Sequence, residues 1–238
     1  MTSNVRAFGA PGGRPFVFWH ALGPDASSEY FEDVARVLAA HGFDVYGIDG
    51  PGFGASPLVE PEEYRLDALA RRLWATVDGL GLERPVLAGH SWGGAIAVTA
   101  AAQRPADVSA LVLFDSGHID YRDLDDVDPD KPLDAWIAEV QARPDPRNAE
   151  ARAYAMRGLT DPISQAWPVL AERRLPTLLL LATAEPHGEV NRTHVGRFEA
   201  ALPDAEVRWV DGAGHGIVQD VGPPLADELA AWLAEPGS

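Results

Sequence analysis

The sequence predicts an α/β fold in which helices cover both faces of a mostly parallel β-sheet. Two observations predict it. Short, fully apolar runs alternate with stretches of helical periodicity, which is the pattern of a parallel sheet buried on both sides. The chain also has 238 residues, 46% of them hydrophobic, which is enough for one domain with a full core.

The first half of the chain contains four strand patterns and three helix patterns. Apolar side chains recur at helical spacing at Phe31, Val34 and Leu38, and in a longer stripe over residues 66–80. Because Gly42 follows the first stripe where a C-terminal cap belongs, we expect that helix to end there. The expected strands are 16–19, 45–48, 85–88 and 111–114, and the expected helices are 31–38, 66–80 and 95–102.

The same alternation returns near the end of the chain. It predicts strands at 177–181 and 207–210, a helix at 195–202, and a last helix striped by Leu225, Leu229 and Leu233. Residues 116–174 hold helical patterns without a strand pattern, so we expect a helical insertion into a core formed by residues 1–115 and 175–238. The segment before Phe16 is too short for two full strands, which favours a sheet of about seven strands.

The composition excludes several classes of function. A net charge of −17 repels nucleic acid and anionic membrane surfaces, which favours a small-molecule substrate. The chain has no cysteine, so disulfides, thiolate metal sites and cysteine nucleophiles are excluded. The sequence shows no signal peptide and no apolar run near 18 residues, so we expect a cytoplasmic protein with no membrane segment, as a monomer or homodimer.

Residues 89–93, Gly-His-Ser-Trp-Gly, match the pattern G-x-S-x-G. The motif follows an apolar strand and precedes an Ala-rich helix, which is the strand–turn–helix setting of a nucleophile elbow. Glycines on either side permit the tight turn, and the N-terminal N–H groups of the helix favour developing negative charge. Ser91 is therefore predicted to be a nucleophile. The alternative is an ordinary turn serine that caps the helix.

His215 is the predicted general base among seven histidines. It follows the last predicted strand and lies between Gly214 and Gly216, which let a loop bring the imidazole close to other backbone. The alternative is a solvent-exposed loop histidine. The spacings H-x-H-x-D-H and H-E-x-x-H do not occur, so we expect no metal site.

Two carboxylates compete for the role of orienting His215. Glu185 and Asp115 each follow a predicted strand, and the orienting acid selects the tautomer of the base and stabilises the imidazolium. We favour Glu185 as this acid. Asp115 stays open as the alternative, although it could simply bond to nearby backbone. Asp211 is a weaker third choice because it lies so close to His215 in the sequence.

Four segments together resemble the α/β-hydrolase superfamily over nearly the whole chain. Residues 20–23 (His-Ala-Leu-Gly) are similar to its H-G-x-G/P oxyanion segment, and residues 49–56 to its D-x-R-G-x-G-x-S loop. Residues 89–94 are similar to its G-H-S-x-G-G elbow, and residues 214–215 to its late G-H. The helical insertion falls where the superfamily carries its cap.

The resemblance implies an α/β-hydrolase fold with Ser91, His215 and Glu185 as the catalytic triad. It also implies an oxyanion hole formed by the backbone N–H groups of Leu22 and Trp92. The sequence departs from the family pattern at three site positions. Ala21 replaces the usual glycine, Pro51 replaces the usual arginine, and Glu185 replaces the commoner aspartate.

The implied activity is hydrolysis of a small ester, thioester or lactone through an acyl-enzyme on Ser91, with no cofactor. Alternatives on the same triad are C–C bond hydrolysis, perhydrolysis and a proline-iminopeptidase-like aminopeptidase activity. A non-catalytic ligand receptor is a further alternative, because fold alone does not determine function. For the substrate-binding candidates, packing of the core or cap is the competing interpretation; these are His20, Trp19, His118, Trp136 and Trp167.

Overall fold

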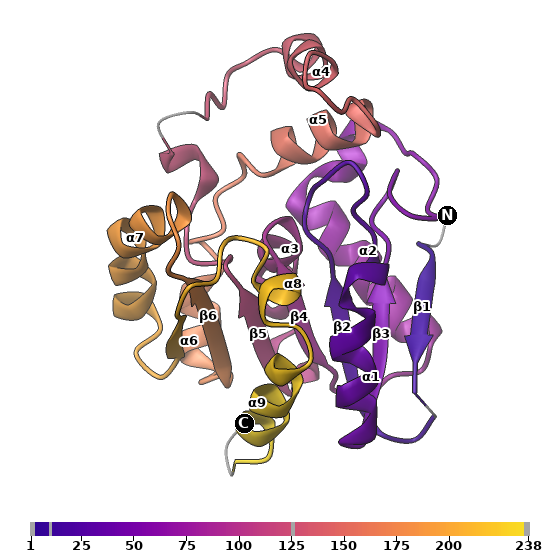
Figure 1. Ribbon diagram of the computed structural model, residues 1–238, viewed down its shortest axis with the longest axis vertical. Helices are drawn as coiled ribbons and strands as arrows, with labels where there is room; N and C mark the ends of the chain where they lie inside the picture. Colours follow the sequence, from indigo (N-terminus) through magenta and orange to yellow (C-terminus); the bar gives the residue numbers. More distant parts are fainter. Residues whose placement is uncertain (1–2, 10, 125–126, 236–238) are drawn as a thin grey trace.

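A seven-stranded sheet runs through the centre of the molecule in the order β1-β3-β2-β4-β5-β6-β7 (Figure 1). The computed structural model describes residues 3–9, 11–124 and 127–235. Strand β1 is antiparallel to β3, and the other neighbouring strands are parallel, which confirms the predicted sheet. The strands are β1 (Val5–Phe8), β2 (Arg14–Trp19), β3 (Phe43–Ile48), β4 (Val86–His90), β5 (Ala110–Phe114), β6 (Thr177–Ala182) and β7 (Glu206–Val210).

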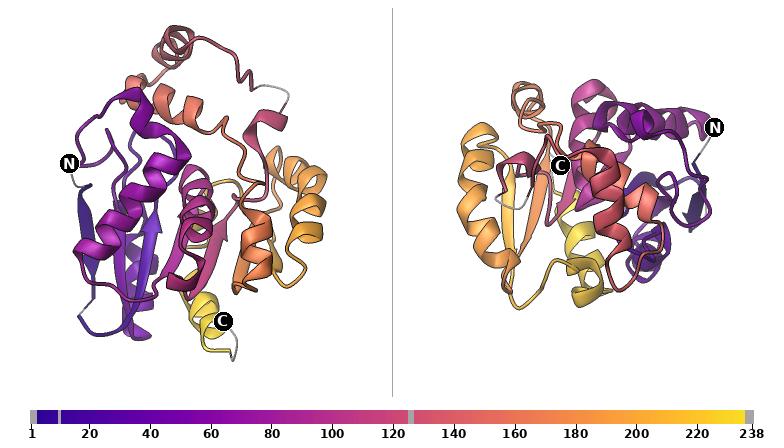
Figure 2. Two further views of the ribbon diagram at one scale, coloured as in Figure 1. Left: turned by 180° about the vertical axis from the view of Figure 1, so that it is seen from behind. Right: turned by 90° about the horizontal axis from the view of Figure 1, so that it is seen from above.

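Helices cover both faces of the sheet (Figures 1 and 2). One face packs against α1 (Glu32–Ala40), α8 (Ile217–Val221) and α9 (Pro224–Leu233). The other packs against α2 (Leu66–Gly79), α3 (Trp92–Gln103), α6 (Trp167–Glu172) and α7 (His187–Ala201). Phe16 and Phe18 of β2 enter the first core, whereas Val17 and Trp19 enter the second. Both faces are buried, so the strands read as continuous apolar runs.

The insertion at residues 116–174 contains α4 (Leu133–Gln141), α5 (Ala149–Gly158) and α6, and no strand within its described part. Helices α4 and α5 lie beyond one end of the sheet and share a small core of Trp136, Val140 and Ala153 (Figure 1). Helix α6 instead joins the main core through Trp167 and Leu170. We therefore propose that the cap consists of α4 and α5 with their connections.

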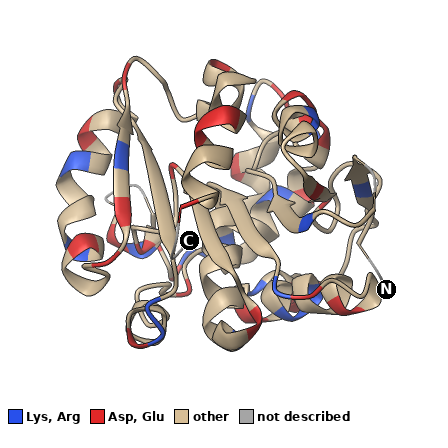
Figure 3. Ribbon diagram, turned by 90° about the horizontal axis from the view of Figure 1, so that it is seen from below, with Lys and Arg blue, Asp and Glu red and all other residues tan. Residues whose placement is uncertain are grey.

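The described part of the chain also contains four short 3-10 helices: η1 (Ser28–Phe31), η2 (Pro61–Tyr64), η3 (Pro105–Asp107) and η4 (Tyr121–Asp123). Charged residues gather on the outer helices and loops and are few on the strands (Figure 3). Within the described ranges, every helix falls short of the length and apolar character that crossing a membrane requires.

Candidate active site

Ser91 lies at a sharp turn between β4 and α3. Its backbone has φ 53° and ψ −116°, a conformation that costs a non-glycine residue about 1–3 kcal/mol and is concentrated at functional sites. The turn requires its flanking glycines. A Cβ atom on Gly89 would lie 2.1 Å from the carbonyl oxygen of Gly93, and one on Gly93 would lie 2.1 Å from that of Trp19. The local structure is therefore the expected strand–turn–helix elbow.

The imidazole of His215 is hydrogen bonded to Asp115. Its Nδ1 lies 2.6 Å from Oδ2 of Asp115, which directly follows β5. Asp115 is buried and, like Ser91, has a positive φ of 46°. Burial alone would raise the pKa of Asp115. Hydrogen bonds from His215, Ala182 and Asn191 outweigh it and hold that pKa below the ordinary value.

The prediction that Glu185 orients His215 is wrong. The Glu185 side chain is exposed, and its Oε2 accepts a hydrogen bond from the backbone N–H of Glu189 at 3.0 Å. Its Oε1 pairs with Arg192. Glu185 therefore interacts with the first turns of α7, where a carboxylate is favoured by the free N–H groups of the helix. The alternative considered from the sequence, Asp115, is the carboxylate that contacts His215.

Tyr121 was not singled out from the sequence, yet it contacts the serine. Its hydroxyl is hydrogen bonded with the side chain of Ser91. Burial raises the pKa of Tyr121 to about 12, and the hydrogen bond with Ser91 opposes this only in part. The phenol therefore stays protonated next to Ser91. Tyr121 belongs to η4, at the start of the insertion, so the insertion supplies a group directly at the nucleophile.

A chain of hydrogen bonds ties the loops around the elbow together. The backbone N–H of Ala21 donates to the hydroxyl of Tyr30 at 2.9 Å, and that hydroxyl lies 2.9 Å from Nδ1 of His90. Nε2 of His90 in turn lies 2.6 Å from the carbonyl oxygen of His215. Burial, together with the nearby His215, lowers the pKa of His90 to about 3, so its ring is neutral. His90 therefore anchors the His215 loop beside Ser91.

His20 organises the loop that carries the predicted oxyanion donor Leu22. The buried ring accepts a hydrogen bond from Gly50 N–H at Nε2 (2.9 Å) and donates from Nδ1 to the Ala21 carbonyl (2.6 Å). The C=O and N–H of a trans peptide point in opposite directions, so the N–H of Leu22 points away from His20. The N–H of Trp92 is the first of α3 and has no partner within the helix. This geometry is compatible with the predicted role of the Leu22 and Trp92 N–H groups as oxyanion donors.

His187, at the start of α7, stacks on His215. The ring centroids are 4.4 Å apart and the rings are nearly parallel, at 14°. Partial burial and the neighbouring His215 both lower the pKa of His187. The signal for this contact was its position two residues after Glu185, at the start of α7, where the end of β6 meets the His215 loop.

Asp115, His187 and His215 hold potential metal-ligand atoms within 4.8 Å of one another. Because the two rings are stacked, their in-plane lone pairs run side by side and do not converge on one point. Nδ1 of His215 is also engaged by Asp115. The geometry therefore favours a hydrogen-bonded pair with a stacked neighbour over a metal centre.

The five substrate-binding candidates are all buried. Trp19 lies in the main core, and His20 holds its loop as described. Trp136 lies in the cap core, with the Lys131 ammonium 4.0 Å from its ring centroid. Trp167 donates a hydrogen bond from Nε1 to the Gly117 carbonyl at 3.1 Å. His118 is hydrogen bonded to Asn191. Each has a packing role here, and a role in binding stays a prediction.

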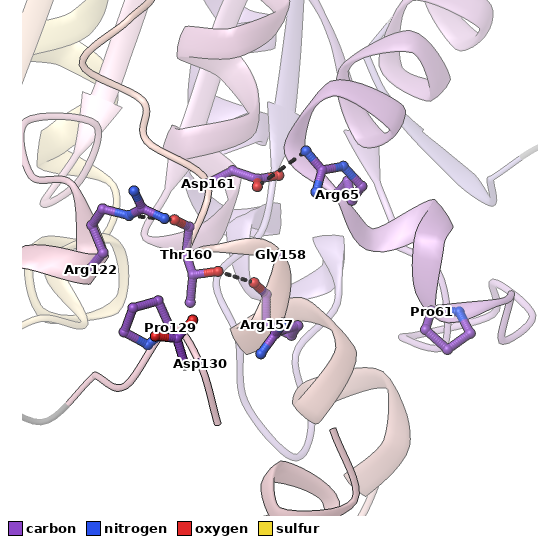
Figure 4. A pocket seen from close by; sticks show the side chains of 9 residues that line it. All are labelled: Pro61, Arg65, Arg122, Pro129, Asp130, Arg157, Gly158, Thr160 and Asp161. Atoms are coloured by element: carbon purple, nitrogen blue, oxygen red, sulfur yellow. Dashed lines mark hydrogen bonds and ion pairs between the residues drawn. The ribbon is translucent and has the colours of Figure 1, made fainter. Parts of the chain in front are cut away.

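A charged cavity of about 520 Å³ lies between the insertion and the core (Figure 4). Three arginines line it, which is notable in a chain with a net charge of −17. Nε of Arg122 donates to the Thr160 carbonyl at 3.0 Å, and Arg65 pairs with Asp161 at 3.3 Å. Arg157 and Asp130 complete the charged lining. Arg122 directly follows Tyr121 in the chain, whereas Ser91, Asp115 and His215 are not among the residues that line this cavity.

A family model for the alpha/beta hydrolase fold matches residues 14–157, more than half of the 238 residues. The chain belongs to this family. Lipase 1 of Psychrobacter immobilis is 25% identical over 249 residues, covering 92% of this chain and 77% of the lipase. The 2-hydroxy-6-oxo-6-phenylhexa-2,4-dienoate hydrolase of Comamonas testosteroni is 34% identical over 107 residues, covering 44% of this chain and 37% of that enzyme.

The solved structures agree with this α/β hydrolase in fold. A carboxylesterase structure from Nitrososphaera gargenis superposes with a TM-score of 0.78 at 17% identity, covering 98% of this chain and 94% of that chain. For several curated relatives the match spans only 36–37% of their length. The family and its relatives support a hydrolase, without naming the substrate.

Proposed function

We propose that this α/β hydrolase cleaves a small ester, thioester or lactone through an acyl-enzyme on Ser91. The observation that carries the proposal is the hydrogen-bonded pair of His215 and Asp115 in the loops around a strained serine elbow. A nucleophilic serine, a histidine base and a buried carboxylate are the parts that acyl transfer requires.

In the proposed reaction, His215 takes the proton of the Ser91 hydroxyl as Oγ attacks the substrate carbonyl carbon. Asp115 stays ionised, holds the Nδ1–H of His215 and stabilises the imidazolium. His215 then protonates the leaving group, and water attacks the acyl-enzyme with His215 again as base.

The negative charge that develops on the carbonyl oxygen is proposed to be stabilised by the N–H groups of Leu22 and Trp92. Loss of one such donor typically costs about 2.7–4 kcal/mol of transition-state stabilisation. The hydrogen bonds of His20 to Gly50 and Ala21 support this assignment, since they fix the peptide that precedes Leu22.

We further propose that the cavity lined by Arg65, Arg122 and Arg157 receives a polar or anionic part of the substrate. Guanidinium groups bind carboxylates and phosphates in a planar, two-point geometry. The name of the Comamonas relative's substrate, a dienoate, includes a carboxylate, which agrees with this chemistry. The same relative makes hydrolysis of a C–C bond next to a ketone the second candidate function on this triad.

The test is turnover of p-nitrophenyl esters and of a lactone panel by purified protein and by the variant Ser91→Ala. We expect Ser91→Ala to lose at least about a thousandfold in kcat, because triad serines contribute on this scale or above. The control is Thr193→Ala on the exposed side of α7, which should keep full activity. Unchanged turnover by Ser91→Ala would contradict the proposal. Fluorophosphonate labelling of Ser91 without turnover would favour the receptor alternative.

A further inference from the structure

Behind the His215–Asp115 pair, a second set of buried polar groups continues the hydrogen-bond chain. Asn191, from α7, is 3% exposed and lies between Asp115 and His118. Its Nδ2 lies 2.6 Å from Oδ1 of Asp115 and 3.0 Å from the carbonyl oxygen of Ala182. Its Oδ1 lies 3.1 Å from Nε2 of His118, which is 2% exposed.

We propose that Asn191 and His118 are positioning residues that hold Asp115 ionised and correctly turned toward His215. The proposal rests on the proposed function, because it assigns these residues to the orienting acid of the same site. Neither residue needs to contact the substrate. They act through the carboxylate of Asp115: the hydrogen-bonded chain runs from His118 through Asn191 and Asp115 to His215, the proposed base of Ser91.

The neighbours of Asn191 allow only one orientation of its amide. The carboxylate oxygen of Asp115 and the carbonyl oxygen of Ala182 are acceptors without a proton, so both must face the NH2 group. The amide oxygen must then face His118, which has to donate from Nε2. Burial lowers the pKa of His118 to about 4, so the ring is neutral, and the contact with the Asn191 oxygen assigns its single proton to Nε2. His118 thereby donates to the amide oxygen and completes the hydrogen bonding of Asn191.

The amide supplies Asp115 with a donor that the backbone alone does not provide. Oδ1 of Asp115 accepts from Asn191 Nδ2 and from the Ala182 backbone N–H at 2.9 Å, while Oδ2 is left for His215. A buried carboxylate keeps its charge only if such donors satisfy it. Without Asn191, the pKa of Asp115 should rise, and the carboxylate should be free to rotate away from His215.

Several other titratable groups lie close enough to influence the Asp115–His215 pair. They are His90 from β4, Tyr121 from η4, and His187 and His194 from α7, in addition to His118. The pKa values of His90 and His187 are lowered and that of Tyr121 is raised, which favours the neutral form of each. Asp115 is therefore the anion of the cluster, and a change in its proton affinity should appear directly in the pH profile.

The experiment measures kcat and KM from pH 5 to pH 9 for Asn191→Leu and Asn191→Asp. Loss of a hydrogen bond to a charged group typically changes a rate by about 10–100-fold, and we expect kcat of Asn191→Leu to fall by this factor with KM unchanged. Asn191→Asp places a second carboxylate beside Asp115. We expect the acidic limb of kcat/KM to move to higher pH, because a second carboxylate of like charge raises the pKa of Asp115.

The second pair of variants tests His118. His118→Gln retains an N–H near the position of Nε2 and should keep most of the activity, whereas His118→Phe removes the donor and should resemble Asn191→Leu. Glu189→Gln, an exposed position on the same helix, is the matched control and should behave as the unaltered protein. Thermal unfolding of every variant separates loss of fold from loss of positioning.

Two outcomes would overturn the inference. One is an unchanged acidic limb in folded Asn191→Asp; the other is equal activity of His118→Gln and His118→Phe. If the Asn191 variants do not fold, the His118 pair alone decides. Failure of the proposed function is distinguishable, because then the unaltered protein itself would show no Ser91-dependent turnover.

Discussion

The ends of β5 and β6 are adjacent at one edge of the sheet, and each is followed by a carboxylate. After β5, Asp115 is buried and accepts hydrogen bonds from His215, Asn191 and the backbone of Ala182. After β6, Glu185 is exposed and is hydrogen bonded within the start of its own helix. Two carboxylates at equivalent strand ends therefore have different environments.

The difference teaches that placement at a strand end does not by itself make an orienting acid. Burial removes water as a competitor for the histidine, and fixed donors are then needed to keep the buried group charged. Asp115 has both, and its short side chain and positive φ direct the carboxylate at the loop of His215. Glu185 is exposed instead, and its donors, the Glu189 N–H and Arg192, hold it at the surface of α7.

The largest expected effect comes from replacing the carboxylate at each of these two strand ends by its amide. We expect Asp115→Asn to lower kcat on p-nitrophenyl esters by about 10⁴-fold, the loss found when a triad aspartate becomes its amide and the wrong tautomer is held. Glu185→Gln should stay within about twofold of the unaltered protein, since exposed ion pairs contribute little. A greater loss in Glu185→Gln than in Asp115→Asn would reverse the comparison.

The end of β6 still contributes to the site, through the ring of His187 in place of the Glu185 carboxylate. An aromatic contact contributes about 0.5–1.5 kcal/mol, so His187→Ala should lower kcat about 2- to 10-fold. His187→Phe should preserve the stack and most of the activity. Steady-state kinetics at pH 8 measure both variants. Equal losses in the alanine and phenylalanine variants would mean that stacking is not the contribution.

The smallest effect is expected where the insertion meets the core, at Arg122. Arg122→Gln should raise KM for a p-nitrophenyl glutarate hemiester by about fivefold or less, as one exposed charge contact implies. KM for the neutral butyrate ester should not change. The control is Arg143→Gln on the cap, away from the cavity. Equal KM changes for the charged and neutral esters would contradict the proposal that this cavity binds an anionic part of the substrate.

Much of this architecture is predictable from local patterns. The parallel sheet, the helices on both faces and the elbow at Ser91 follow from apolar runs and one tightly spaced glycine motif, because those signals act over a few residues. His215 was predictable for the same reason, since flanking glycines and its position after the last strand are local features.

The rest of the site depends on contacts between distant segments. Asn191 and His187 lie on a helix whose polar residues carry no pattern that distinguishes an inward side chain from an outward one. Tyr121 lies in the insertion, where its contact with Ser91 depends on how η4 packs. The choice of Asp115 over Glu185 depended on which strand end is buried, and the sequence order of the two acids does not contain that information.

The central claim is that Asp115, through His215, activates Ser91. The most direct test is the rate at which a fluorophosphonate labels Ser91, because it needs no knowledge of the substrate. We predict slow labelling in Asp115→Asn and normal labelling in Glu185→Gln, with the adduct mapped to Ser91. Normal labelling in Asp115→Asn together with slow labelling in Glu185→Gln would contradict the account.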